Sequence, residues 1–161
     1  MSVITPRTME EFENAIRSEI DSVRMGAAVN RGFKPTEEMA LIGLNDPNVN
    51  VRSAWADRGD YPLNVEIMET MMLDSSFRVR LSASYKKHKP TDRMLIIALH
   101  DLLPSVVISW LKRDDWTPTP EQIKEGLGSE NKDIVNAWVD KLKRISEQSM
   151  QDAGACGGYT L

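Results

Sequence analysis

The chain has 161 residues, of which 41% are hydrophobic and 27% charged, and its net charge is −4 at neutral pH. These values predict a globular protein of ordinary single-domain size, and the negative balance argues against a dedicated nucleic-acid binder. No apolar run approaches the roughly 20 residues that cross a bilayer, and the N-terminus has no signal-peptide pattern. We therefore expect a cytoplasmic protein without a membrane partner, and the single cysteine, Cys156, excludes internal disulfides.

Residues 8–20 predict an acidic amphipathic helix with Phe12, Ile16 and Ile20 on one face. Thr8 and Glu11 have the spacing of a capping box, in which two side chains satisfy the free amides of a first turn. A helix of this kind is typical of the atypical end unit that covers the exposed face of a helical array.

The repeat that follows is marked by five valines in a 28-residue register: Val23, Val51, Val79, Val107 and Val135. A fixed spacing of this size is typical of proteins in which each unit buries its apolar face on the next. Each unit has a polar opening, an apolar helix, a break that carries proline, and a second helix. The sequence therefore predicts an all-α fold, a short α-solenoid of about four and a half helix pairs over residues 21–142.

The helix starts have recognisable signals. Candidate N-caps of the first helices in units one to three are Asp21, either Asp46 or Asn48, and Asp74. The second helices are expected to start near Pro35, Pro62, Pro90 and Pro120. Thr119 and Gln122 form another capping-box pattern.

The C-terminal part predicts a longer closing helix over residues 131–146, with Trp138 and Leu142 on its apolar side. We expect one domain over residues 1–147. Residues 148–161 have little apolar content and are expected to form a flexible tail, in which Cys156 has no assigned redox role.

The pattern of aspartate, four residues, valine and arginine, followed by an apolar helix, a proline and a second helix, resembles HEAT-type repeats. The short period and the segment ADRGDYPLNVEIMETMMLDSSFRVR look more like the leucine-rich-variant subgroup. The resemblance covers about residues 21–142 and weakens where Ile108 and Asn136 replace the arginine. It implies a right-handed superhelix that serves as an interaction surface. Some leucine-rich-variant proteins carry an iron–sulfur cluster on several cysteines, which this chain lacks, so no cofactor is expected.

The arginines that follow three of the valines, Arg24, Arg52 and Arg80, admit two interpretations. They could form an anion-binding row, or they could pair with aspartates of neighbouring units, as the resemblance implies. Asp46 and Asp74 are the expected partners. A guanidinium forked onto a carboxylate would fix the stacking of units, and we favour this structural role.

A basic run between Arg78 and Arg93 holds six basic residues and one acid. Its net charge of +5 leaves −9 for the rest of a chain whose total is −4. The run could be a solvated helix face, or it could contact phosphates or an acidic partner protein. Because the remaining charge would repel a long polyanion, we prefer an acidic protein to a nucleic acid.

The tryptophans at core positions of the repeat, Trp55 and Trp138, are expected to pack inside. Tyr61 and Trp116 lie in the breaks between helices and are expected to be exposed contact points. The residues proposed to bind a partner are Tyr61, Arg78, Tyr85, Lys86, Lys87, Lys89, Arg93, Arg113 and Trp116.

Trp110 and Asp114, with Arg113 beside them, resemble the grip of HEAT-like DNA glycosylases, although this spacing is common in helices and core packing is favoured for Trp110. His88 and His100 are far apart, so no metal site is expected. No nucleotide-binding or hydrolase motif is present. We predict a non-catalytic protein-interaction module or accessory protein without a cofactor or small-molecule substrate. The alternative is a nucleic-acid-binding HEAT-like relative of the glycosylases.

Overall fold

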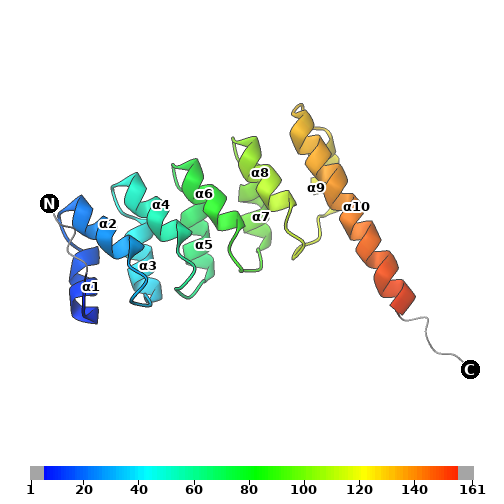
Figure 1. The fold of residues 1–161 in the computed structure, drawn as a ribbon. Coiled ribbons are helices and arrows are strands. Elements are labelled where there is room, and N and C mark those ends of the chain that lie inside the picture. The colour runs from blue at the N-terminus through cyan, green and yellow to red at the C-terminus, as the bar shows by residue number, and fades with distance from the viewer. Residues whose placement is uncertain (1–5, 156–161) are drawn as a thin grey trace, which may run out of the picture. The chain divides into compact units, whose positions relative to one another are not determined.

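The structure, a computed structural model, describes residues 6–155, which form ten α-helices and no strand (Figure 1). The chain divides into two compact units, Met1–His88 and Lys89–Leu161. The described part of the first unit contains α1 to α6, and that of the second contains α7 to α10. The predicted all-α fold is confirmed over the described residues, while the single domain over residues 1–147 stays a prediction.

The helices of the first unit are α1 (Met9–Ile16), α2 (Asp21–Val29), α3 (Glu37–Leu44), α4 (Val49–Asp57), α5 (Val65–Met72) and α6 (Phe77–Ser84). They form two layers. In one layer α2 packs against α4 and α4 against α6, and in the other α1 packs against α3 and α3 against α5. Figure 1 draws this alternation in blue to green.

The core of the first unit lies between these layers and is rich in methionine and aromatic side chains. The Phe12 ring centroid lies 6.3 Å from that of Trp55, which is itself almost fully buried. Trp55 lies directly over the backbone of Gly43, where an added Cβ would come within 2.2 Å of the indole. The close approach of α3 and α4 therefore depends on a residue without a side chain.

The start of α1 realises only half of the predicted capping box. The Thr8 hydroxyl accepts from the Glu11 amide at 3.1 Å, but the Glu11 carboxylate accepts from the Arg7 amide. The helix ends at Ile16, so the prediction of a helix to residue 20 is wrong at its end. The Ser18 hydroxyl accepts from the Ile20 amide, and this local bond competes with helix continuation.

The N-caps of the first helices differ in part from the prediction. Asn48 caps α4 and accepts from the Asn50 amide, as one of the two alternatives expected. Asp21 is the first residue of α2 rather than its cap. Asp74 precedes the cap of α6, Ser76, and accepts from the Ser76 amide at 2.7 Å. Asp74 therefore stabilises the turn before the helix, which is a common role for aspartate.

The helices of the second unit are α7 (Asp92–Leu99), α8 (Pro104–Leu111), α9 (Pro120–Leu127) and α10 (Lys132–Ala155). Helix α8 packs against α7 and α10, and α9 packs against α10. Trp110 and Trp138 are buried in this core, as Trp55 is in the first unit, so the predicted packing of these three tryptophans is confirmed. Within the described residues, no helix has both the length and the apolar character that a membrane crossing requires.

The ends of α9 and α10 test two further predictions. The capping box of Thr119 and Gln122 is confirmed, since each accepts from the backbone amide of the other. Helix α10 continues through residues 148–155, so the expectation of a flexible tail from residue 148 is wrong there. Gln148 and Met150 are good helix formers, and they extend the helix without burial. Cys156 and the rest of the predicted tail lie outside the described residues.

Candidate partner-binding surface

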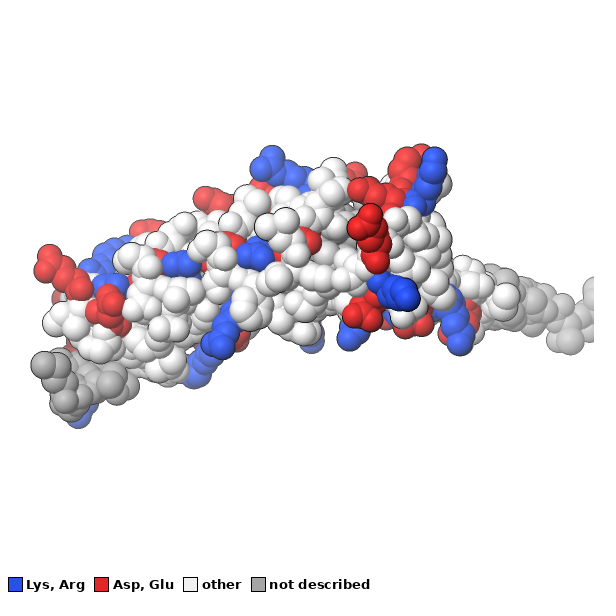
Figure 2. Space-filling view, turned by 90° about the horizontal axis from the view of Figure 1, so that it is seen from above, with Lys and Arg blue, Asp and Glu red and all other residues white. Residues whose placement is uncertain are grey.

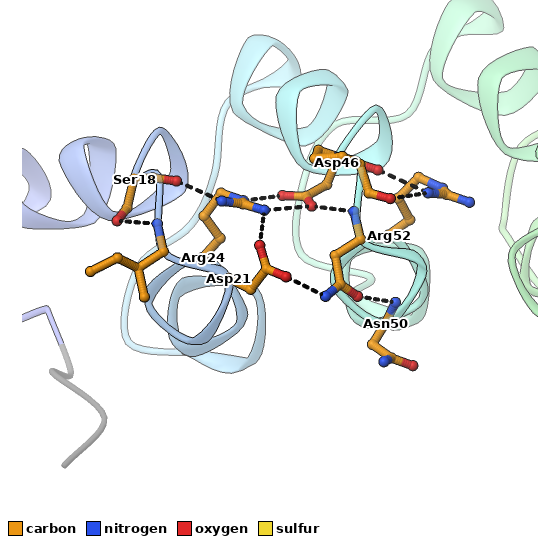
Figure 3. A network of polar contacts seen from close by, with 9 residues as sticks. Ser18, Asp21, Arg24, Asp46, Asn50 and Arg52 are labelled. Atoms are coloured by element: carbon orange, nitrogen blue, oxygen red, sulfur yellow. Dashed lines mark hydrogen bonds and ion pairs between the residues drawn. The ribbon is translucent and has the colours of Figure 1, made fainter. Parts of the chain in front are cut away.

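Arginine–aspartate pairs join neighbouring helix pairs of the first unit, and Figure 3 shows the first of them, Arg24 with Asp46. Arg24 donates through Nε to Asp46 at 2.6 Å, and Arg52 donates in the same way to Asp74 at 2.7 Å. Both aspartates are the partners that the sequence predicts. The pairs therefore stabilise the contact of α2 with α4 and of α4 with α6, and they do not form an anion-binding row.

The same pairs are part of a larger polar network at the helix starts. Arg24 also donates to the Ser18 carbonyl at 2.7 Å, and Arg52 and Arg80 donate to the carbonyls of Asp46 and Asp74 at 2.9 Å. Hydrogen bonds from Asn48 and Arg24 lower the pKa of the Asp21 carboxyl. On the face drawn in Figure 2, blue and red side chains accordingly lie beside one another or stand singly in a white surface.

A fully enclosed arginine, Arg58, lies in the break after α4. Its guanidinium forks onto the Asp60 carboxylate at 2.9 and 2.7 Å and stacks 5.1 Å from the Trp55 ring centroid. It also donates to four backbone carbonyls, those of Ala27, Ala28, Asn30 and Phe33. Arg58 therefore satisfies carbonyls that the preceding break would otherwise bury without donors.

Tyr61 belongs to the same cluster and is only 4% exposed, so the prediction that it is an exposed contact point is wrong. Its hydroxyl donates to the Trp55 carbonyl at 3.0 Å, and the Lys86 ammonium lies 5.6 Å from its ring centroid. Lys86 also donates to the Arg58 carbonyl. Burial disfavours the charged form of each group, so it lowers the pKa of Lys86 and raises the pKa of Tyr61. We call Trp55, Arg58, Asp60, Tyr61 and Lys86 the first cluster.

The second unit contains a matching set of residues, each 55 positions further along the chain. This second cluster consists of Trp110, Arg113, Asp115, Trp116 and Lys141. The Arg113 guanidinium lies 4.7 Å from the Trp110 ring centroid, and its Nε donates to Asp115 at 2.9 Å. The Trp116 indole donates to the Trp110 carbonyl, as Tyr61 does to Trp55.

Trp116 and Arg113 are therefore structural, and the prediction that Trp116 is exposed is wrong, because only 6% of it reaches solvent. The Lys141 ammonium lies 4.2 Å from the Trp116 ring centroid and donates to the carbonyls of Arg113 and Trp116. The Lys141 side chain is fully buried, and this burial lowers its pKa to about 8. Lys141 and Arg58 were not among the residues expected from the sequence to have a role.

One groove in the first unit does collect exposed residues of the basic run. It has a volume of about 650 Å³ and lies between the C-terminal ends of α4 and α6 and the segments that follow them. Tyr85 stands at this groove with 73% of its surface exposed, next to Lys86 and Lys87. Asp57 lines the groove as well, and its carboxylate accepts from the Ser82 hydroxyl at 2.8 Å.

The other predicted binding residues do not join this groove. Arg78 is exposed at the opposite, N-terminal end of α6. Lys89 and Arg93 are exposed but belong to the second unit, so the basic run is divided between the two units. Of the nine residues proposed from the sequence, the groove in the first unit brings together Tyr85, Lys86 and Lys87.

Comparisons with models of protein families, with curated proteins and with solved structures find no match for this chain. The candidate site therefore stands on its own geometry.

Trp110, Arg113 and Asp114, which resemble the DNA-gripping residues of HEAT-like glycosylases, do not form a common exposed site. Trp110 is buried, and Asp114 pairs with Arg144 at 2.9 Å instead of standing free beside it. Within the described residues, no three histidine, cysteine, aspartate or glutamate side chains come together as metal ligands. His100 contacts the Glu125 carboxylate at 3.0 Å.

A sequence signal for the two clusters exists. The segments WADRGDY, which starts at Trp55, and WLKRDDW, which starts at Trp110, share tryptophan, arginine, aspartate and a final aromatic residue at the same spacing. A search for internal repeats at 55 residues would have found this pattern, and its charged residues between aromatics indicate paired, buried charges.

Proposed function

We propose that the chain is a non-catalytic protein-binding module, a short α-solenoid of HEAT-like helix pairs, that binds an acidic segment of a partner protein in the groove of its first unit. The observation that carries this proposal is the exposed Tyr85 beside Lys86 and Lys87 at a groove of about 650 Å³. Exposed aromatic residues are frequent anchors of protein interfaces, and surrounding charges select the partner.

Contacts at fixed chain separations support the solenoid part of the proposal. Arg58 donates to the Asn30 carbonyl and Lys86 to the Arg58 carbonyl, and both bonds span 28 residues. The pairs Arg24–Asp46 and Arg52–Asp74 both span 22 residues. Equivalent contacts between successive helix pairs are what stacked repeats produce.

The charge near the groove supports an acidic partner. Four cations, Arg31, Arg58, Lys86 and Lys87, stand against two carboxylates, Asp57 and Asp60. The surplus is positive by two, although the whole chain is negative. Arg58 and Asp60 pair inside the unit, so the surplus comes from Arg31, Lys86 and Lys87 against Asp57. Charges at the rim of a site accelerate association and make it sensitive to salt.

The contacts of the polar groups support a binding role over a catalytic one. Asp57 accepts from Ser82, and Lys86 donates to a backbone carbonyl and lies over the Tyr61 ring. Both groups are held by neighbours of their own unit, whereas a general acid or base has to reach a bound substrate. Tyr85 and Lys87 are exposed at the groove and can meet a partner directly.

The test uses two fluorescein-labelled amphipathic peptides of about 14 residues, roughly four helical turns. One consists of leucine and glutamate and the other of leucine and lysine in the same pattern. We expect the leucine–glutamate peptide to raise its anisotropy with the full chain. The double variant Tyr85→Ser/Lys87→Ser should weaken this binding about tenfold, since it removes an aromatic anchor and a rim charge.

The matched control is Leu102→Ser/Lys143→Ser in the second unit, which removes one exposed lysine and one exposed large apolar side chain elsewhere. It should leave the affinity unchanged, and equal losses in both double variants would contradict the proposal. A gel shift with duplex and single-stranded DNA addresses the alternative. Tight binding with a steep salt dependence would favour a nucleic-acid-binding protein instead.

A further inference from the structure

A second groove lies in the second unit, between α7, α9 and the start of α10. It has a volume of about 410 Å³, and its apolar lining includes Ile96, Ile134 and Trp138. Binding sites for small ligands commonly have about 300–1,000 Å³. The groove therefore has room for one or two inserted side chains.

Helix α9 leaves this groove open because of how it contacts α10. The Trp138 indole lies over the backbone of Gly126, where an added Cβ would come within 1.9 Å of the ring. The helix is thus held through its backbone, and none of its residues is buried. In the first unit, by contrast, α3 and α5 each bury four residues. The side chains of α9 line the second groove without filling it.

An apolar side chain on α7 stands uncovered at this groove. Ile96 is 57% exposed, although Met94, Leu95 and Ala98 of the same helix are buried in the core. Among the described residues that line the groove, Ile96 is the most exposed large apolar one. Covering such a side chain by a partner removes apolar surface from water and favours binding.

The charge at this groove is opposite to that of the first. Glu121 and Glu125 line it, and no lysine or arginine is among its described lining residues. The His100 ring contacts two acceptor groups, the Glu125 carboxylate at 3.0 Å and the Ile96 carbonyl at 2.8 Å. A carboxylate has about four lone-pair sites, so Glu125 can accept from a further donor beside His100.

We propose that this groove is a second binding site, which takes a short basic segment of a partner protein. An apolar side chain of the segment would insert against Ile134 and Ile96. A lysine or arginine about one helical turn away would pair with Glu121 and Glu125. The site lies in a different unit from the first groove and selects the opposite charge, so it does not depend on the acidic-partner proposal.

The leucine–lysine peptide is the probe, used with the full chain in the anisotropy assay. The variant Glu121→Gln/Glu125→Gln keeps the side-chain shapes and removes both charges, and it should weaken binding about five- to tenfold. Ile96→Ser should weaken binding to a similar extent because it removes the uncovered apolar wall. Far-UV circular dichroism and a thermal melt establish that each variant is folded.

Glu13→Gln/Glu19→Gln is the matched control, since it makes the same change of net charge at exposed positions of the first unit. It should leave the affinity of the leucine–lysine peptide unchanged. Equal weakening in this control would mean unspecific attraction and would overturn the proposal. Absence of binding of the leucine–lysine peptide would also overturn the proposal. So would a result in which Glu121→Gln/Glu125→Gln weakens the binding of the leucine–glutamate peptide as much as that of the leucine–lysine peptide. Tyr85→Ser/Lys87→Ser should not affect this probe, so the two proposals fail independently.

Discussion

The enclosed cation of the first cluster is an arginine, Arg58, whereas that of the second is a lysine, Lys141. Arg58 donates to four backbone carbonyls and to Asp60, and Lys141 donates to two carbonyls. An arginine offers five fixed donors and stays charged, but a lysine offers three and loses its proton more readily when buried. Each cluster contains both an arginine and a lysine at matching positions, so the clusters differ in which of the two cations is fully enclosed and in how many carbonyls depend on it.

Replacing the arginines tests this difference most strongly. Arg58→Met should lower the free energy of unfolding by about 3–5 kcal/mol, because several buried carbonyls and Asp60 lose their donor. Arg113→Met should cost about 1–2 kcal/mol, since its partner Asp115 is 42% exposed and can be hydrated. Urea denaturation followed by circular dichroism measures both values. Equal losses would mean that the two arginines have the same role.

The pH dependence of stability isolates Lys141. Burial lowers its folded pKa to about 8 from an ordinary value of 10.5, so above about pH 8 the unfolded chain binds more protons than the folded one. The free energy of unfolding should therefore rise, by roughly 2 kcal/mol, between about pH 8 and pH 10. Lys141→Met should reduce this rise, and the part that remains belongs to Lys86, whose pKa burial lowers as well.

Denaturation curves across this pH range provide the measurement. The range ends near pH 10 because burial also raises the pKa of Tyr61, so that its ionisation on unfolding lowers stability at higher pH. An identical pH profile in Lys141→Met would assign the rise to another group.

The two glycines that contact tryptophan rings should differ less in their effect on stability. Gly43→Ala should cost about 2 kcal/mol, because the new methyl group meets Trp55 and α3 is anchored by buried residues. Gly126→Ala should cost less, about 1 kcal/mol, since α9 has no buried residue and can move away from Trp138. Thermal unfolding of the two variants side by side decides the order, and a larger loss for Gly126→Ala would contradict our description of α9.

Removing one hydroxyl from the first cluster should have the smallest effect. Tyr61→Phe deletes the donor to the Trp55 carbonyl and should cost about 0.5–1.5 kcal/mol. Tyr85→Phe is the control, and it should leave stability unchanged because that side chain is exposed. A comparable loss in the control would show that Tyr85 also supports the fold.

Much of the helical framework was predictable because it depends on local and periodic signals. The pairing of Arg24 with Asp46 and of Arg52 with Asp74 was expected from the resemblance to HEAT-type repeats, and the capping box of Thr119 follows from a spacing of three. Tyr85, Lys86 and Lys87 were proposed because the basic run contains an aromatic residue, and the structure places these three at one groove. Each of these signals lies within one or two of the 28-residue repeats.

The burial of Tyr61 and Trp116 was not predictable in this way. A break between helices is usually exposed, but here each aromatic ring is covered by a lysine from the next helix pair of its own unit, Lys86 or Lys141. Cations are seldom buried, so composition alone places them at the surface. Only the contact between a cation, a ring and a backbone carbonyl makes their burial favourable.

Arg58, Lys86 and Lys141 each donate one hydrogen bond to the backbone carbonyl of the residue 28 positions earlier in the chain. Such a bond requires a fixed number of residues between donor and acceptor, because adding or deleting one residue moves the donor away from its carbonyl. Connecting segments usually accept insertions easily. In this chain the breaks after α2, α4 and α8 are expected to be among the places least tolerant of a change in length, and related sequences that keep these cations should keep the lengths of these breaks.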